Sequence, residues 1–228
     1  MSLPFTLDQF LDVFRRYNEW VRAGEVLLNG LAVVAVVAAL RGGRGPSRIA
    51  SGILAALWVW MGVVYHLWFF RPINPAALAF GMIFVCQGLL IAWLGLVRGT
   101  LRFDPRVGAA TFVGLAMGVY ALFIYPLIGY AIGHQYPAAP SFGVPCPTTI
   151  FMLGLMLLTS APRLRSVIVV PAAWAVVGGI AAVQLGMWED LGLVVAAIVT
   201  TIFVFAQREE RRTGAIGGTL TTTYGHAD

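Results

Sequence analysis

Seven apolar runs separated by short polar connections constrain this chain more than any other feature. Several of them approach or exceed the ~18 apolar residues that indicate a transmembrane helix. Because a membrane core offers the backbone no water, such runs must form helices or a closed barrel. Continuous runs, in place of short alternating ones, exclude the barrel. With 59% hydrophobic residues, 11% charged residues and a mean hydropathy of +0.84, the sequence predicts an all-α polytopic membrane helical bundle.

The runs predict seven transmembrane helices, of which the fifth is short. Their ranges are 23–40, 50–70, 76–97, 108–132, 148–161, 167–187 and 191–206. At 1.5 Å per residue the fifth reaches only ~21 Å across a hydrocarbon core of ~30 Å. In the fourth, the pairs Gly114/Gly118 and Gly129/Gly133 predict close helix approach, and Pro126 predicts a kink.

The arginines predict how these helices are oriented. All 15 basic residues of the chain are arginines, and most lie in short connections, which indicates topology and argues against nucleic-acid binding. If the fifth run crosses the membrane, eleven arginines share the side of the C-terminus and four remain on the other. The eleven are Arg41, Arg44, Arg48, Arg98, Arg102, Arg106, Arg163, Arg165, Arg208, Arg211 and Arg212. The positive-inside rule then predicts seven transmembrane helices with the N-terminus outside and the C-terminus inside.

Two terminal segments flank this transmembrane domain, which we place at residues 23–207. Residues 1–22 hold an amphipathic helix, with Thr6 and Gln9 forming a capping box and Phe5 and Phe10 a hydrophobic staple. We expect this helix to lie in the membrane interface as an anchor, or alternatively to pack over the mouth of the bundle as a lid. Residues 208–228, rich in Gly and Thr, predict a disordered cytoplasmic tail.

Most of the unusual polar residues fall on the predicted outer side. Several of them belong to or adjoin the proline-rich loop 134–149, and ionisable groups at membrane depth are functional candidates. The candidate substrate- or ion-binding residues are His66, Asn74, His134, Tyr136, Cys146, Thr148, Glu189 and Asp190.

Each candidate also has a structural interpretation. His66 fits a hydrogen bond to a neighbouring helix, and His134 fits a partner for a helix C-terminus. Cys146, predicted as the N-cap of the short helix, fits either a thiolate favoured by the helix dipole or a small space-filling side chain. Glu189 and Asp190 fit a cap for the last helix. Asn74, followed by Pro75, predicts the start of the third helix.

The same residue types suit a transition metal such as zinc. His66, His134, Cys146 and Glu189 are the weak metal candidates, since no two of them have a metal-binding spacing such as HxxH or CxxC. No cofactor is predicted. The sequence also lacks a phosphate-binding glycine loop and a GxSxG nucleophile motif.

Five stretches resemble a family of uncharacterised prokaryotic integral membrane proteins that carry the label "domain of unknown function". They are WVWMGVVYH (58–66), INPAA (73–77), GHQYP (133–137), FGVPCPTTIFMLGL (142–155) and WED (188–190). The resemblance covers about residues 4–206. It implies a multi-pass protein of the bacterial cytoplasmic (inner) membrane and no particular activity.

These observations lead to three functional hypotheses. The first is a small-solute or ion transporter or channel with its recognition site at the outer face, where the N-terminus of the short helix favours an anionic group. The second is an outward-facing, membrane-embedded enzyme that depends on a metal or a thiol. The third is an accessory subunit of a membrane complex. The expected partners are the lipid bilayer and a second copy or another membrane subunit.

Overall fold

The computed structural model describes residues 3–159 and 164–206, and these residues form helices and their connections. Six of the helices are long and apolar enough to cross a membrane. They are Ala23–Arg41 (α2), Arg44–Phe70 (α3 and η1), Ala77–Val97 (α4 and η2), Ala109–Ala131 (α5, η3 and α6), Leu164–Leu185 (α8) and Trp188–Ala206, the C-terminal helix. The prediction of an all-helical chain with transmembrane-type helices is confirmed at this level. The predicted tail, 208–228, lies outside the described residues.

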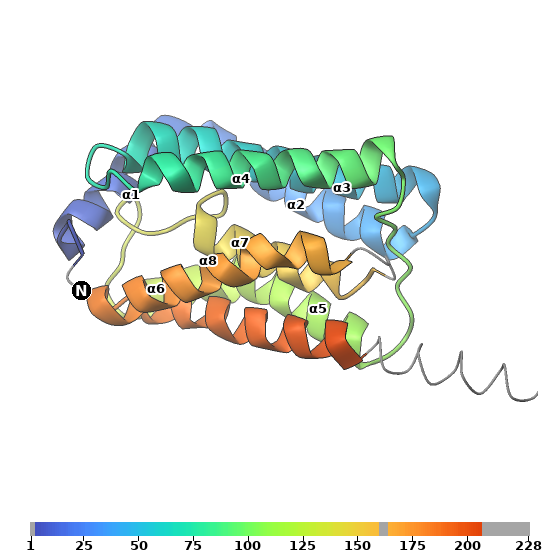
Figure 1. The fold of residues 1–228 in the computed structure, drawn as a ribbon. Helices are drawn as coiled ribbons and strands as arrows, with labels where there is room; N and C mark the ends of the chain where they lie inside the picture. Colours follow the sequence, from blue (N-terminus) through green and yellow to red (C-terminus); the bar gives the residue numbers. More distant parts are fainter. Residues whose placement is uncertain (1–2, 160–163, 207–228) are drawn as a thin grey trace, which may run out of the picture.

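The long helices run side by side as one elongated bundle, with different connections at its two ends (Figure 1). One end, the α1 end, carries α1 (Leu7–Val21), the connections 71–76 and 132–144, and the turn Trp188–Asp190. The opposite end, the arginine end, carries the connections 42–43 and 98–108. The sides of the bundle between these ends expose large apolar side chains, such as Val26, Phe112 and Ile202, as a lipid environment requires.

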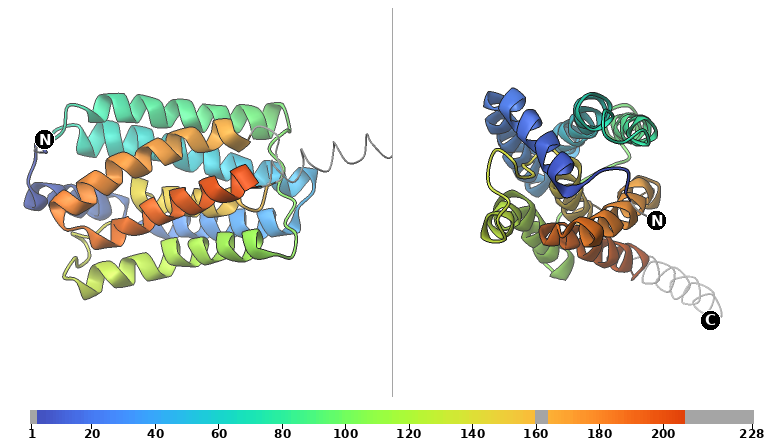
Figure 2. Two further views of the ribbon diagram at one scale, coloured as in Figure 1. Left: turned by 60° about the horizontal axis from the view of Figure 1, so that its bottom comes forward. Right: turned by 90° about the vertical axis from the view of Figure 1, so that its left-hand side faces the viewer.

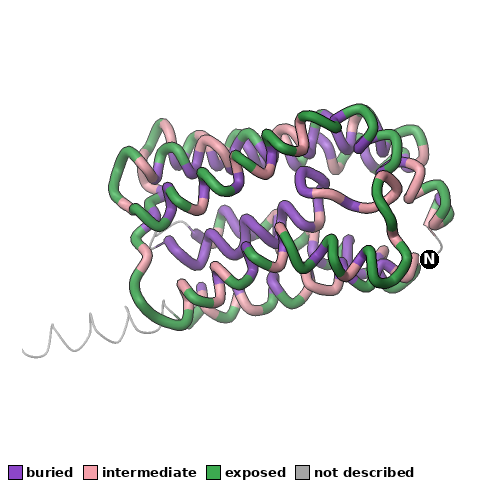
Figure 3. The backbone as a smooth tube through the Cα atoms, turned by 180° about the vertical axis from the view of Figure 1, so that it is seen from behind, coloured by how far each residue is buried: buried purple, intermediate pink, exposed green. Residues whose placement is uncertain are grey.

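The short apolar helix α7 (Pro145–Met156) occupies the middle of the bundle (Figure 2). Its residues from Pro147 to Met156 are all buried, as the tube coloured by burial also shows (Figure 3). A helix that is apolar on every side belongs in a protein interior, and its twelve residues reach only ~18 Å. The connection 132–144 therefore makes up the missing length by carrying the chain from the α1 end into the bundle.

Glycine allows α7 to pack closely against α5 (Ala109–Val119). A Cβ atom placed on Gly114 would lie 2.4 Å from the carbonyl oxygen of Gly154, so neither position has room for a side chain. The close approach predicted at Gly114 is confirmed. Gly133, by contrast, has no neighbour within 4 Å of such an atom and adopts a φ of +102°, so it serves the turn after α6 (Tyr125–Ala131).

Helix α1 packs against the bundle at the α1 end. Thr6 and Gln9 form the predicted capping box, and the rings of Phe5 and Phe10 stack with centroids 5.5 Å apart. Farther along, Phe14 and Tyr17 are buried against Tyr65 of η1 (Met61–Phe70), with ring centroids 6.0 Å apart in each pair. The apolar face of α1 therefore covers protein at this end of the bundle, and both the anchor and the lid stay predictions.

Two predicted helix starts are shifted. Helix α4 (Ala77–Ala92) has Ala76 as its N-cap, while Asn74 accepts a hydrogen bond from the Ala76 N–H at 3.1 Å in the preceding turn. Helix α7 has Val144 as its N-cap, so Cys146 is its second residue and not its cap. The reason is Pro145, whose fixed φ and missing N–H suit the first position of a helix. The kink at Pro126 stays a prediction, and a π-helical turn, η3 (Tyr120–Ile124), lies just before the proline.

Candidate functional site: an aromatic cavity at the α1 end

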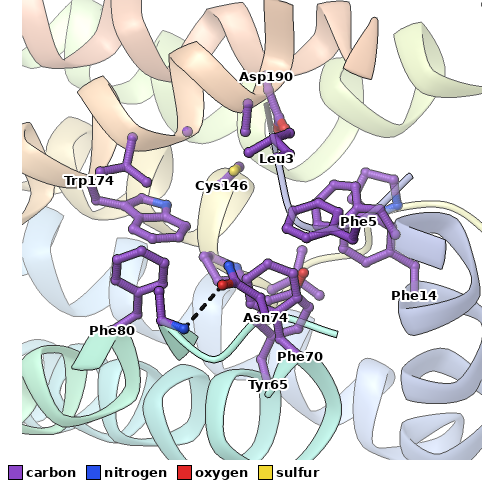
Figure 4. Close-up of a pocket in the computed structure, with 18 of the residues that line it drawn as sticks. Leu3, Phe5, Phe14, Tyr65, Phe70, Asn74, Phe80, Cys146, Trp174 and Asp190 are labelled. Atoms are coloured by element: carbon purple, nitrogen blue, oxygen red, sulfur yellow. Dashed lines mark hydrogen bonds between the residues drawn. The ribbon is translucent and has the colours of Figure 1, made fainter. Parts of the chain in front are cut away.

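A cavity of about 250 Å³ lies between α1, η1, α7 and α8 at the α1 end (Figure 4). Leu3, Pro4 and Phe5, which precede α1, form part of its wall. Aromatic rings from five helices and from the segment before α1 provide most of the rest. They belong to Phe5, Phe10, Phe14, Tyr65, Phe70, Phe80, Tyr125 and Trp174. The cavity is small and mostly apolar, as sites for small organic molecules generally are.

Asp190 supplies the carboxylate of this cavity. It is 4% exposed, and its Oδ1 accepts a short hydrogen bond from the hydroxyl of Tyr125. The thiol of Cys146, on the same wall, lies beside Asp190 as a second neutral neighbour. Among the described residues, no arginine forms an ion pair with Asp190. A buried carboxylate usually requires a cationic partner, so Asp190 could still pair with a cation that enters the cavity.

Glu189 points elsewhere, although it is the neighbour of Asp190. Its Oε1 lies 2.7 Å from Nδ1 of His134, and its backbone oxygen accepts a hydrogen bond from the hydroxyl of Tyr120 at 2.9 Å. Its Oε2 is buried and has no hydrogen-bond partner. Gly129 of α6 makes room for this pair, with its Cβ position 3.4 Å from Oε1 of Glu189. The two adjacent acids therefore divide into a histidine-paired one and one that faces the cavity.

His66 belongs to neither group. Its ring is fully buried and packs against Phe84, Trp174 and Phe80, with centroids 4.6, 5.1 and 5.9 Å away. Both ring nitrogens lack a hydrogen-bond partner, so the predicted bond to a neighbouring helix is not formed. Aromatic side chains enclose the ring at the point where a metal ligand or a proton carrier would need polar neighbours.

The predicted metal set is therefore not assembled. Within residues 3–159 and 164–206, no three His, Cys, Asp or Glu side chains come close enough to hold one ion. His134 and Glu189 meet, Cys146 lies at the cavity beside Asp190, and His66 is enclosed by aromatic rings.

The remaining predicted residues have positions that differ in kind. Asn74 lines the cavity and is 8% exposed. Thr148 is fully buried, and its hydroxyl oxygen accepts a hydrogen bond from the Gly143 N–H at 2.9 Å, which fixes the connection to the start of α7. Tyr136 is 56% exposed and does not contribute to the cavity wall. Thr148 is therefore structural, and Tyr136 lies outside the site.

Asn18 holds the site in place, although it is not among the predicted site residues. Its side-chain nitrogen donates hydrogen bonds to the backbone oxygens of Pro137 and Ala139, each at 2.7 Å. Its oxygen accepts a third from the Ser141 hydroxyl at 2.8 Å. All of these contacts connect α1 to the connection 132–144, which forms another part of the cavity wall through Pro140 and Val144. The available signal was position, since Asn18 lies four residues after Phe14 on the apolar face of α1.

Comparison with known proteins gives a family and no activity. The profile of the Family of unknown function (DUF6064) matches residues 7–215, nearly the whole chain. This confirms the resemblance to an uncharacterised family that the five sequence stretches indicate. No curated protein and no solved structure matches the chain.

Proposed function

We propose a function from the aromatic cavity itself, because the chain belongs to the Family of unknown function (DUF6064), whose description assigns none. In this proposal the protein is a membrane carrier that binds a small organic cation in the cavity at its outer face. The single observation that carries the proposal is Asp190, a buried carboxylate with only neutral hydrogen-bonding neighbours, in a cavity walled by aromatic rings.

The proposed topology has seven crossings in the bacterial cytoplasmic membrane. The six long helices are joined by α7 as the seventh, which runs from the connection 132–144 to the arginine end. There the backbone N–H of Asp104 donates a hydrogen bond to the oxygen of Leu158, 2.9 Å away. Arginine-rich connections favour the cytoplasm, so the arginine end would be inside and α1 with the cavity outside.

Aromatic rings and a carboxylate together favour a cation. The face of an aromatic ring attracts an ammonium or guanidinium group, more strongly when the group is desolvated. Trp174, Phe80 and Phe14 border the same cavity as Asp190 (Figure 4). A cationic group placed between them would pair with the carboxylate and lie against ring faces, and the apolar part of the molecule would bury itself against the remaining wall.

This geometry does not favour the anionic group that the helix N-terminus suggested. Pro145 and Pro147 occupy two of the first three positions of α7, and proline has no backbone N–H to offer an anion. Asp190, which lies at the same cavity, would repel one.

A carrier fits the bundle better than an open channel. From Ile150 to Leu158 the central segment is at most 3% exposed apart from Gly154, and it consists of apolar side chains and that glycine. No polar path leads through this part of the described structure, so a solute would cross only after a rearrangement. The N-terminal segment is the natural moving part on the outer side, since Leu3 and Phe5 close the cavity.

Binding is tested with choline and its neutral isostere, 3,3-dimethylbutan-1-ol, by calorimetry on the purified protein in detergent. We expect choline to bind and the neutral compound to bind weakly, and we expect Asp190→Asn to reduce choline affinity at least about tenfold. Asp104→Asn removes an acid from the arginine end and is the matched control. Equal binding of the two compounds, or an Asp190→Asn variant with unchanged affinity, would refute the cation site.

Transport is tested separately by uptake of labelled choline into proteoliposomes. Uptake that Asp190→Asn abolishes would support a carrier. Binding without uptake would instead reduce the function to recognition alone.

A further inference from the structure

A second pocket, of about 210 Å³, lies at the arginine end, far from the aromatic cavity. Its lining comes from the start of α3 (Arg44–Trp60) and from the segment between the end of η2 (Trp93–Val97) and Arg102. The four arginines of the lining are Arg44, Arg48, Arg98 and Arg102. No acidic side chain belongs to it. All four are exposed to solvent, and an anion in the pocket would lower the repulsion among them.

Two of these arginines are already oriented by the backbone. An Nη of Arg48 donates to the carbonyl oxygen of Leu96 at 2.6 Å, and Nε of Arg102 donates to that of Gly99 at 3.2 Å. Each guanidinium has five N–H donors, so several remain available after these bonds. A side chain fixed at one donor loses less conformational entropy when its other donors bind a ligand.

The neighbouring acid is already engaged. Asp104 is the acidic residue of the 98–108 connection, and its carboxylate lies 3.6 Å from the guanidinium of Arg106, which is not part of the pocket. None of the four pocket arginines forms an ion pair with any described acidic residue. The positive charge of the pocket is therefore uncompensated within residues 3–159 and 164–206.

A helix N-terminus adds to this charge. Helix α3 begins at Arg44, and Gly43, its N-cap, has no side chain with which to accept the first N–H groups. The first turn contains no acidic residue either. The partial positive charge of a 17-residue helix thus remains unopposed beside the guanidinium groups.

We propose that this pocket binds a phosphate group. Guanidinium groups bind phosphate through paired N–H donors, and the start of α3, where Arg44 lines the pocket, adds the positive end of the helix dipole. The phosphate can belong to the headgroup of an anionic phospholipid or to a soluble phosphate compound, and the chemistry of recognition is the same. The pocket opens where the first connection meets the third, at the ends of helices whose sides are apolar, which is the depth at which lipid headgroups would lie.

The experiment compares two double variants that remove equal charge from the same end. Arg44→Gln/Arg98→Gln removes two pocket arginines and leaves the backbone-bonded Arg48 intact. Arg41→Gln/Arg106→Gln removes two arginines outside the pocket. Affinities are measured by calorimetry in detergent for three probes, which are inorganic phosphate, short-chain phosphatidylglycerol and short-chain phosphatidylcholine.

We expect the pocket double variant to weaken binding of the anionic probe at least about tenfold and the control double variant to change it less than about twofold. If phosphatidylglycerol binds and inorganic phosphate does not, the pocket is assigned to a lipid headgroup. If both bind, it is assigned to phosphate in general. Equal losses in the two double variants would mean diffuse surface attraction and would overturn the site. Unchanged affinity of the pocket double variant for both anionic probes, or no binding of either by the unaltered protein, would overturn it as well. Phosphatidylcholine is the zwitterionic reference, and the pocket double variant should change its binding less than about twofold. Intact thermal unfolding of the variants excludes misfolding as the cause of a loss.

Discussion

The two ends of the bundle treat charge in opposite ways. At the α1 end, Glu189 and Asp190 are almost completely buried and engaged by His134 and Tyr125. At the arginine end the pocket arginines are exposed, and the structure pairs none of them with a described acid. Buried charge requires fixed partners, whereas solvated charge does not. The acids of the α1 end are therefore held in fixed hydrogen-bonded positions, whereas the arginines of the arginine end remain available to attract an anion.

Two backbone turns, one from each end, differ in how tightly they are packed. Gly143 at the α1 end and Gly99 at the arginine end both have positive φ, of +105° and +59°. A Cβ atom on Gly143 would lie 2.6 Å from the side chain of Leu28 and 2.8 Å from the hydroxyl of Tyr17, whereas one on Gly99 would meet nothing within 4 Å. Packing density, and not turn geometry, distinguishes these two positions.

The largest effect is therefore expected from Gly143→Ala. Strain at positive φ and overlap with Leu28 and Tyr17 together cost about 3 kcal/mol or more of unfolding free energy. Gly99→Ala carries only the strain, about 1 kcal/mol. Both values are measured by denaturant-induced unfolding in detergent micelles, followed by tryptophan fluorescence. Similar losses at the two positions would show that these two turns are equally packed and would remove the contrast.

An intermediate effect is expected from Asn18→Ala. Loss of the side chain leaves the backbone oxygens of Pro137 and Ala139 without their donor, and we expect about 2 kcal/mol of destabilisation. Asn29→Ala is the control, since Asn29 bonds only within its own helix, to the oxygen of Glu25 at 2.8 Å. Hydrogen exchange of residues 134–144 gives a second measurement. Unchanged protection of this connection in Asn18→Ala would contradict the role of Asn18 as its clamp.

The smallest effect is expected from Tyr17→Phe. The hydroxyl of Tyr17 accepts a hydrogen bond from Nε1 of Trp60 at 2.8 Å, and burial raises the pKa of the phenol, so it stays neutral. Removing the hydroxyl costs about 1 kcal/mol, because the indole N–H loses its partner while the ring packing remains. Tyr130→Phe, at a ring that is 65% exposed, is the matched control and should leave the unfolding midpoint unchanged. A larger loss at Tyr130 would place the tight packing elsewhere.

Much of this fold follows from the sequence, because lipid imposes a strict rule on long apolar runs. Helix existence, the capping box at Thr6 and the close approach at Gly114 all follow from local residue patterns. The N-caps of α4 and α7 were each misplaced by two residues, and in α7 the reason is Pro145, which takes the first helical position. The seven-crossing count and the orientation stay predictions.

The candidate site was harder to predict, because it depends on which helix faces which. Asp190, Cys146 and Asn74 were selected as polar residues near one end, and all three line the cavity. The aromatic wall gave no such signal, since aromatic residues such as Tyr65 and Trp174 occur in a protein core, at a lipid-facing surface and at a ligand-binding site alike. His66 was selected for its ionisable ring, yet its neighbours are aromatic rings contributed by helices distant in sequence. Neither its burial nor a function explains why a histidine stands at this position.

The buried position of α7 also has a consequence for how the chain is made. A segment that enters the bilayer during synthesis is normally accepted because its side chains dissolve in lipid, one helix at a time. Helix α7 is short, begins with two prolines in three residues and ends up with no face toward lipid. Insertion of α7 must therefore follow that of the helices that surround it, above all α5, whose Gly114 lets α7 pack closely. A nascent chain that stopped before α8 would lack part of the packing around α7, and this helix would then be open to degradation by quality-control proteases.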